Sequence, residues 1–169
     1  TTHDGIFLTG DANVLIANSL FTKNRGSGIS AVGASSGEIR GNTFDNTGFG
    51  LSIGQKSQVS LVNNRINNNV DGIIISNVAT PILRSNTITN NNRNGLVILK
   101  DRSGQPAPDV GTANDPGRNS IRDNKVKDIQ NISGIAFAAA GNELNRSKIV
   151  GSIDTIATSF VSRSPLSVR

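Results

Sequence analysis

Acidic side chains that could bind a metal or catalyse hydrolysis gather in one turn-rich stretch of the sequence. Asp101, Asp109, Asp115 and Asp123 lie there, and Asp128 follows a little further on. Calcium is bound in proteins by several converging carboxylate and carbonyl oxygens, and glycosidases use two carboxyl groups ~5 to 9.5 Å apart. Asp109 and Asp115 are therefore the candidate metal ligands, with Ca²⁺ the only cofactor considered. The alternative interpretation is structural, because Asp also forms turns.

Several other kinds of catalytic centre are excluded by residue counts. The chain has no cysteine and a single histidine, His3. Thiolate metal sites, histidine zinc centres and triads built on histidine therefore cannot be assembled from this chain. Serine and threonine are abundant, but no base is available to activate one of them as a nucleophile.

The charge of the chain favours acidic partners. The net charge is +5 and the isoelectric point is about 10.2. Nucleic acid, an anionic glycan or an anionic surface would suit this balance. Tryptophan and tyrosine are both absent, which removes the side chains that most often stack on bases or sugar rings. Nucleic acid is therefore the least favoured of these partners.

These residues sit in a sequence with an internal repeat. A glycine followed by alternating aliphatic residues recurs at intervals of 22 or 23 residues, and a further copy follows later. The repeat glycines are Gly5, Gly28, Gly50, Gly72, Gly95 and the late Gly134.

A second motif, aliphatic-x-x-Asn-x-apolar, runs in phase with the glycines. Its asparagines are Asn18, Asn42, Asn64, Asn86, Asn124 and Asn142. Asparagine tolerates the left-handed backbone region, and stacked asparagines can hydrogen-bond to one another. The motif therefore predicts a structural asparagine ladder at a sharp bend of the chain.

Each repeat is best explained as one turn of a solenoid. Aliphatic residues alternate with period two, and Gly or Asn interrupts them too often to leave room for a helix. Successive turns, called coils below, would stack as parallel strands ~4.8 Å apart. The prediction is an all-β, right-handed parallel β-helix with coils of 22–23 residues.

The repeat also sets the expected organisation of the chain. Residues 1–144 are predicted to form the coils, with an insertion at about 100–118 that leaves the coil as a surface loop. Residues 145–169 are expected to form a degenerate last coil, a cap and a tail, since a terminal coil must be covered. Gly5 is already in register, which predicts upstream coils or another chain at the N-terminal end. No apolar run is long enough to span a membrane.

Placing the charged residues on these coils suggests one surface. The carboxylates of residues 4–98 fall in different registers or in distant coils, so no catalytic pair is predicted among them. A basic stripe is predicted on one face, suited to bidentate contacts with carboxylate or sulfate. The alternative is that these charges discourage sheet aggregation. The stripe consists of Arg40, Arg84 and Arg122, with Arg65 and Lys125 beside it.

The repeat rows resemble those of the pectate-lyase-like right-handed β-helix superfamily. The segment "DVGTANDPGRNSIRDN", residues 109–124, is similar to one in secreted bacterial β-helix proteins of cyanobacterial type and unknown function, and "AAAGNEL", residues 138–144, resembles its closing segment. The matching positions are Asp109, Gly111, Pro116, Gly117, Asn119 and Ile121. The resemblance implies a secreted, periplasmic or cell-surface location. It is shared by lyases, hydrolases, epimerases, adhesins and tailspikes, so the activity stays open.

Three functional hypotheses remain, with the non-catalytic module favoured. The first is a secreted or cell-surface module that binds acidic polysaccharide or cell-surface glycan, or serves as an extracellular structural element. The alternative is the C-terminal part of a polysaccharide lyase, hydrolase or epimerase that acts on uronate-type glycans. A third role, as an assembly piece, would place another chain at the N-terminal coil.

Overall fold

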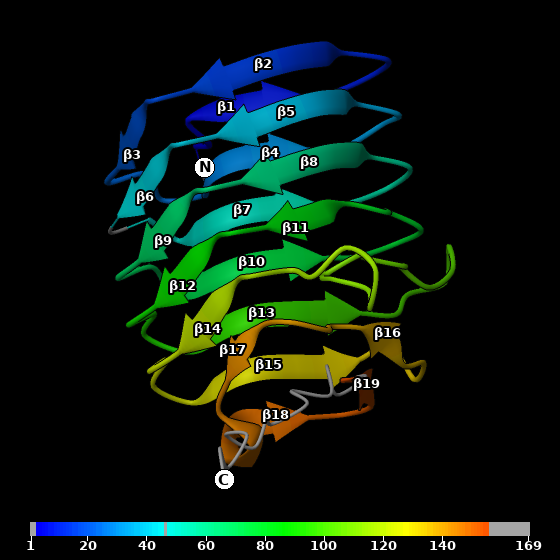
Figure 1. The fold of residues 1–169 in the computed structure, drawn as a ribbon. Coiled ribbons are helices and arrows are strands. Elements are labelled where there is room, and N and C mark those ends of the chain that lie inside the picture. Colours follow the sequence, from blue (N-terminus) through cyan, green and yellow to red (C-terminus); the bar gives the residue numbers. More distant parts are fainter. Residues whose placement is uncertain (1–2, 46, 156–169) are drawn as a thin grey trace, which may run out of the picture.

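The computed structural model describes residues 3–45 and 47–155 as a parallel β-solenoid with three long sheets and a two-stranded sheet near its end (Figure 1). Sheet A contains β1 (Ile6–Leu8), β4 (Ser27–Ala31), β7 (Phe49–Ile53), β10 (Asp71–Ile75), β13 (Asn94–Leu99), β15 (Lys127–Ile132) and β18 (Ile149–Val150). Sheet B contains β2 (Asn13–Ala17), β5 (Ser36–Arg40), β8 (Gln58–Val62) and β11 (Ile82–Arg84). Sheet C contains β3 (Leu20–Thr22), β6 (Thr43–Asp45), β9 (Arg65–Asn67), β12 (Thr87–Thr89), β14 (Ser120–Arg122) and β17 (Glu143–Leu144). The predicted all-β solenoid is confirmed.

The last described residues form shorter elements than the preceding coils. A short 3₁₀ helix, η1 (Arg146–Lys148), leads into β18, and β16 (Phe137–Ala138) pairs with β19 (Ile153–Asp154). Of the predicted degenerate coil, cap and tail, residues 156–169 lie outside the described residues. No helix in the described ranges is long and apolar enough to cross a membrane.

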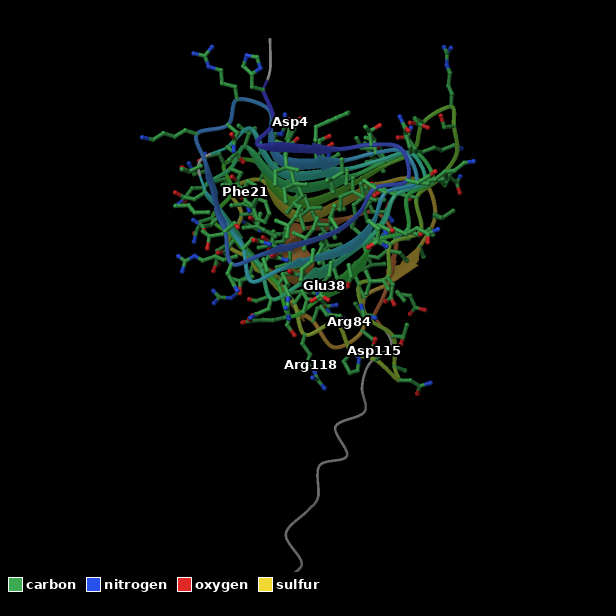
Figure 2. The ribbon with its side chains drawn as sticks, turned by 90° about the horizontal axis from the view of Figure 1, so that it is seen from above. Asp4, Phe21, Glu38, Arg84, Asp115 and Arg118 are labelled. Carbon is green, nitrogen blue, oxygen red and sulfur yellow. The ribbon has the colours of Figure 1, made fainter. Side chains whose placement is uncertain are left out.

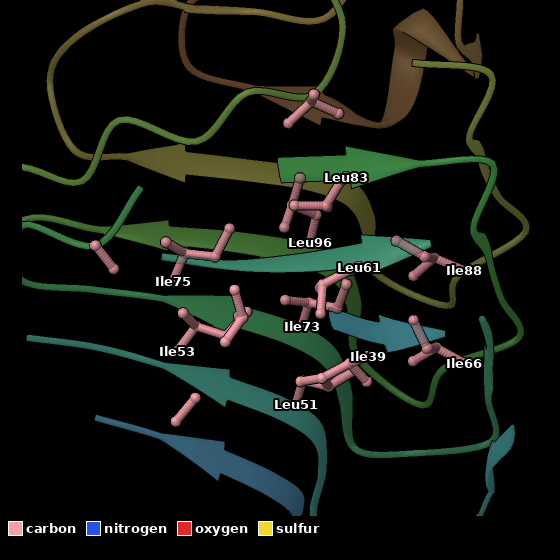
Figure 3. Packing of buried hydrophobic residues seen from close by; sticks show 14 of the residues in the cluster. Ile39, Leu51, Ile53, Leu61, Ile66, Ile73, Ile75, Leu83, Ile88 and Leu96 are labelled. Carbon is pink, nitrogen blue, oxygen red and sulfur yellow. The ribbon is translucent and has the colours of Figure 1, made fainter. Parts of the chain in front are cut away.

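The core is a set of aliphatic columns that run along the solenoid axis (Figure 3). One column comes from sheet A, where Leu51, Ile73 and Leu96 occupy paired positions. Sheets B and C supply facing columns, and all of these side chains are fully buried. Period-two alternation sends every second residue of a strand inward, so each repeat adds one layer to every column.

The register of the first coil differs from the prediction. In the first coil the motif aliphatic-x-x-Asn begins at Leu15, which predicts Leu15 inward and Ile16 outward, but Leu15 is 62% exposed and Ile16 pairs with the buried Ile39. Ile16 follows Gly5 by the same eleven residues that separate Ile39 from Gly28. Because a slip of one residue exchanges the two faces of a strand, the constant spacing identifies the inward residue and the motif letters do not.

The insertion is only partly a surface loop. Asn94 and Lys127 are paired neighbours in sheet A although 33 residues separate them. Between them, the backbone N–H of Asp109 donates to the carbonyl of Pro81 (2.9 Å), and Val110 is fully buried in the core. The middle of the insertion therefore continues sheet B, and only the segments on either side of it are exposed excursions.

Candidate functional site

A continuous asparagine ladder connects the coils at the bend between sheets B and C. It contains Asn42, Asn64, Asn86, Asn119 and Asn142. From Asn64 onward, the Oδ1 atom of each member accepts hydrogen bonds from both the backbone N–H and the Nδ2 group of the member one coil earlier, at 2.8–3.2 Å. The side-chain amides of the ladder hydrogen-bond to one another and to the backbone, so we assign the ladder a structural role.

Two of the predicted ladder members are wrong. Asn18 stands one residue too early, at a left-handed φ of 52°, and the backbone N–H of Ser19 contacts Asn42 instead (2.9 Å). Asn124 belongs to a second ladder with Asn69 and Asn91 at the bend between sheets C and A. The insertion explains the error at Asn124, because it shifts the apparent motif, whereas at Asn18 the motif itself is one residue out of step with the repeat.

The second ladder ends at a buried carboxylate. The Oδ1 atom of Asp128 accepts the backbone N–H of Asn124 (3.0 Å) and its Nδ2 group (2.9 Å). Asp128 is fully buried, and its Oδ2 atom has no hydrogen-bond partner within the described part of the chain. Asp128 therefore terminates this ladder, and it stays apart from the acidic residues of the insertion that were candidates for a metal.

The predicted basic stripe is divided between two sheets. Arg40 and Arg84 both neighbour Val62 in sheet B, whereas Arg122 pairs with Thr89 in sheet C. Arg122 forms ion pairs with Asp123 and Glu143.

The other stripe residues also have local partners. Arg40 lies 3.6 Å from Glu38, and the Nε group of Arg65 donates to Asn67 (2.9 Å). Lys125 donates to Asn92 (2.7 Å). The prediction of one basic stripe along a single sheet face is therefore wrong, because a shared sequence offset did not mean a shared sheet.

Arg84 instead holds the insertion against the coil. Its guanidinium donates to Asp109 Oδ2 (2.7 Å) and to Asp115 Oδ2 (2.8 and 2.9 Å). It also reaches the carbonyls of Leu83 (2.9 Å) and Asp109 (3.1 Å). We call Arg84, Asp109 and Asp115 the Arg84 clamp. In Figure 2, Arg84 and Asp115 lie together, on the side of the solenoid opposite Asp4.

The clamp explains the glycine- and proline-rich motif of the insertion. Asp109 Oδ1 accepts the backbone N–H of Gly111 (2.9 Å), which has a φ of 130°. A side chain at Gly117 would meet the carbonyl oxygen of Val110 at 1.9 Å. The motif residues therefore close a compact excursion over Arg84.

The charges in the clamp fit neither a metal site nor a basic catalyst. Burial lowers the pKa of Arg84, but its hydrogen bonds and charge contacts with Asp109 and Asp115 outweigh burial and raise that pKa above its ordinary value. The hydrogen bond from Arg84 is the main cause that lowers the pKa of Asp115. Both carboxylates face a cation, and the described residues contain no group of three or more His, Asp or Glu placed to bind a metal. Calcium would want more oxygen ligands than this pair offers.

Acid is expected to release the clamp. Because the pKa of Asp115 is lowered in the folded state, its pairing with Arg84 fully stabilises that state at pH values above the ordinary pKa of an aspartate, about 4. This stabilisation is lost as the pH falls through the lowered pKa. Hydrogen exchange, corrected for intrinsic rates, should show residues 112–115 losing protection below about pH 4.

Replacing Asp115 distinguishes acid release of the Arg84 clamp from acid unfolding of the whole protein. Asp115→Asn should remove most of that protection already at neutral pH and abolish the acid step. Asp11→Asn, at an exposed carboxylate remote from the clamp, is the matched control. An acid step that survives in Asp115→Asn would show that another group holds the excursion.

The outer face of sheet A presents a different kind of site. A cavity of about 510 Å³ is lined there by Arg25, Ser27, Phe49 and Arg93, among others. A second cavity, of about 420 Å³, also includes Arg93 and extends along the coil axis to Gln130. Together they form one open groove, which we call the sheet A groove.

Most of the groove's polar edge is one row of residues. Each residue of this row immediately precedes a repeat glycine, or Asp128 in the last copy, and neighbours in it are paired or hydrogen-bonded between coils. We call it the pre-glycine row. Its members are Asp4, Ser27, Phe49, Asp71, Asn94 and Lys127. The sequence analysis missed this row, although its constant position before the glycine was a visible signal.

The row is anchored by a buried ion pair. Asp71 is fully buried and accepts the Nε group of Arg93 (3.0 Å), while the Arg93 side chain is 53% exposed. Asp71 Oδ1 also accepts the backbone N–H and the Nδ2 group of Asn94, each at 3.0 Å. Hydrogen bonds and charge contact with Asp71 raise the pKa of Arg93, so Arg93 stays cationic.

A third cavity, of about 530 Å³, lies at the corner between sheets A and B. Its side chains are engaged in the fold, since Gln55 accepts the N–H of Gly33 (2.9 Å) and Asn77 accepts that of Gln55 (2.8 Å). Neither of the two buried, unpartnered side-chain oxygens of the described residues lies here. The sheet A groove is therefore the better candidate.

Comparison with known proteins supports the fold and leaves the site open. A family model described as "Right handed beta helix region" matches residues 4–163. No curated protein matches the chain, and no solved structure matches it either.

Proposed function

The chain belongs to the right-handed β-helix family, and from this premise we propose that it is a non-catalytic, extracellular module that binds acidic polysaccharide in the sheet A groove. The observation that carries the proposal is that the two cavities of this face meet at Arg93. A groove along the axis crosses successive strands ~4.8 Å apart. It therefore suits an extended polymer better than a compact ligand.

The surface chemistry of the groove supports a sugar polymer. The outward row along its floor is uncharged and consists of Ser30, Ser52, Ile74, Val97 and Gln130. Hydroxyl and amide groups can hydrogen-bond to sugars, and the aliphatic groups can cover their apolar faces. Phe49 adds one aromatic ring to the wall of the larger cavity, and an aromatic ring offers a large apolar contact surface.

The cations of the groove support an acidic polymer. Arg25 and Arg93 line the larger cavity, and Lys127, which lines neither cavity, continues the pre-glycine row beyond Asn94 at the edge of the smaller one. Asp71 is already paired with Arg93, so Arg25 and Lys127 are the cations best placed to receive carboxylate groups. These residues take over the role that the sequence analysis assigned to the arginine stripe.

Charge removal in the groove tests the proposal. We expect Arg25→Ser combined with Lys127→Ser to weaken binding of an oligo-uronate about thirtyfold at low salt, because each of the two exposed contacts is worth about 1 kcal/mol in water. The loss should shrink as salt screens the charges. Calorimetric titration at two salt concentrations measures both effects.

A matched control has the same change in net charge elsewhere. Arg40→Ser combined with Lys56→Ser removes two cations outside the sheet A groove and should leave binding unchanged. An equal loss in both double variants would mean that net charge alone attracts the polymer. Absence of binding by the unsubstituted protein, to this ligand and to an N-acetylated acidic glycan, would overturn the proposal.

The catalytic alternative has a separate readout. β-Elimination requires a base, and the raised pKa of Arg84 makes it unsuited to that task. Incubation with pectate and alginate, with and without Ca²⁺, should therefore leave the ultraviolet absorbance unchanged. A calcium-dependent rise would identify a lyase and contradict the non-catalytic assignment.

A further inference from the structure

The smaller cavity of the sheet A groove is lined by a residue whose side-chain oxygen is buried and has no hydrogen-bond donor in the described ranges of the chain. Asn94 is only 4% exposed and lines this cavity, and its Oδ1 atom has no hydrogen-bond partner within the described residues. The rest of its amide is engaged, because Nδ2 donates to Asp71 (3.0 Å). Leaving a buried acceptor unpaired is unfavourable, so a ligand gains if a small shift of the Asn94 side chain opens this oxygen to the cavity and the ligand brings a donor to it.

The other walls of the cavity are mostly aliphatic. They are formed by Ile74, Val97, Leu99 and Val126, together with the polar Asp71, Arg93 and Gln130. Arg93 uses Nε and one terminal nitrogen on Asp71, and its planar guanidinium has further N–H groups to offer. The cavity thus combines an acceptor, a donor and an apolar wall.

We propose, as an extension of the proposed function, that this cavity receives the acetamido group of an N-acetylated amino sugar within the acidic polysaccharide. The acetamido N–H would donate to Asn94 Oδ1, and its carbonyl would accept from Arg93 or Gln130. Its methyl group would contact Ile74 and Val97. All three parts of the group then have a matching partner.

Other sugar substituents fit this cavity less well. A carboxylate has no donor for Asn94 Oδ1 and would be desolvated beside the carboxylate of Asp71, which is unfavourable. A lone hydroxyl could donate but would leave the aliphatic wall without an apolar partner. The carboxylates of the polymer therefore belong at Lys127 and Arg25, and the ligand class is a polymer containing both uronate and N-acetylhexosamine.

Matched ligands test the inference. We expect an oligosaccharide of alternating glucuronate and N-acetylglucosamine to bind at least tenfold more tightly than an oligogalacturonate of equal charge. The same oligosaccharide carrying N-formyl groups should bind with intermediate affinity, because it keeps the N–H and loses the methyl group. Equal affinity for all three would overturn the inference and leave the proposed function standing. No binding of any would refute both.

Substitutions in the cavity provide an independent test. Ile74→Thr and Val97→Thr keep a β-branched shape on the outer face and should each reduce the preference for N-acetyl over N-formyl several-fold. Ile82→Thr, on the outer face of sheet B, is the matched control and should leave the preference intact. Asn94→Ser should remove the preference for the N-acetylated ligand over oligogalacturonate. Unchanged preference in both threonine variants would overturn the assignment even if Asn94→Ser fails to fold.

Discussion

Replacing Asn86 with alanine is expected to lower the free energy of unfolding by about 4 kcal/mol. Asn86 is 1% exposed, and its Oδ1 atom accepts the backbone N–H and the Nδ2 group of Asn64, both at 3.0 Å. Its Nδ2 group donates to the carbonyl of Leu61 (2.8 Å) and to Asn119 (3.0 Å). Alanine would leave several buried partners unpaired, each at a cost of about 1–3 kcal/mol.

Urea unfolding measures this loss against an exposed asparagine. Asn13→Ala deletes a similar side chain that makes one exposed hydrogen bond, to Ser36 (3.1 Å), and should change stability by no more than about 0.5 kcal/mol. A loss below about 1 kcal/mol for Asn86→Ala would mean that the ladder can open and admit water. The ladder would then guide the bend without stabilising it.

Replacing Gly50 with alanine should destabilise the fold by about 3 kcal/mol, at the upper end of the usual cost of overpacking a core. A Cβ atom at Gly50 would lie 2.5 Å from the carbonyl oxygen of Gly72 and 2.7 Å from the side chain of Ile66. The backbone oxygen cannot move without disturbing the pairing of β7 with β10. The repeat glycine is therefore required by the close approach of two successive coils.

A methyl group added to the outer face of the same strand is the control. Ser52→Thr adds it where Ser52 points into the open sheet A groove and should have little effect, because threonine suits a strand. Comparing unfolding midpoints of the two variants isolates the inward clash. Equal stability of Gly50→Ala and the unsubstituted protein would show that the coils can separate to accept a side chain.

The fold could be predicted because its signals repeat. One copy of Gly-Leu-Ser-Ile would not distinguish a strand from a buried helix segment, but several copies in phase predicted stacked strands. The same regularity predicted the ladder members Asn42, Asn64, Asn86 and Asn142. The ladder prediction was wrong at Asn18, in the first coil, and at Asn124, after the insertion. At both positions the prediction followed the local motif and not the spacing from the repeat.

The charged residues could be assigned to chemistry only after folding. Arg84, Asp109 and Asp115 lie in one clamp because the middle of the insertion returns to sheet B beside β11. The sequence showed two aspartates and a distant arginine, and it could not show that the arginine neutralises both. The predicted calcium ligands and a member of the predicted basic stripe are thus partners in a single ion-pair cluster.

The sequence by itself determined the parallel solenoid, the length of its coils and its inward aliphatic columns, since these depend on local periodicity repeated along the chain. Only the tertiary structure decided which coil neighbours meet at Asp71, Arg93 and Asn94, and which cations remain open to a ligand. The physical reason is that the pairing of charges, and whether a buried oxygen such as Asn94 Oδ1 finds a donor, depend on distances between coils. In the coils before the insertion, a residue's distance from the repeat glycine fixes its sheet and face, whereas its partners depend on the side chains that occupy the adjacent coils.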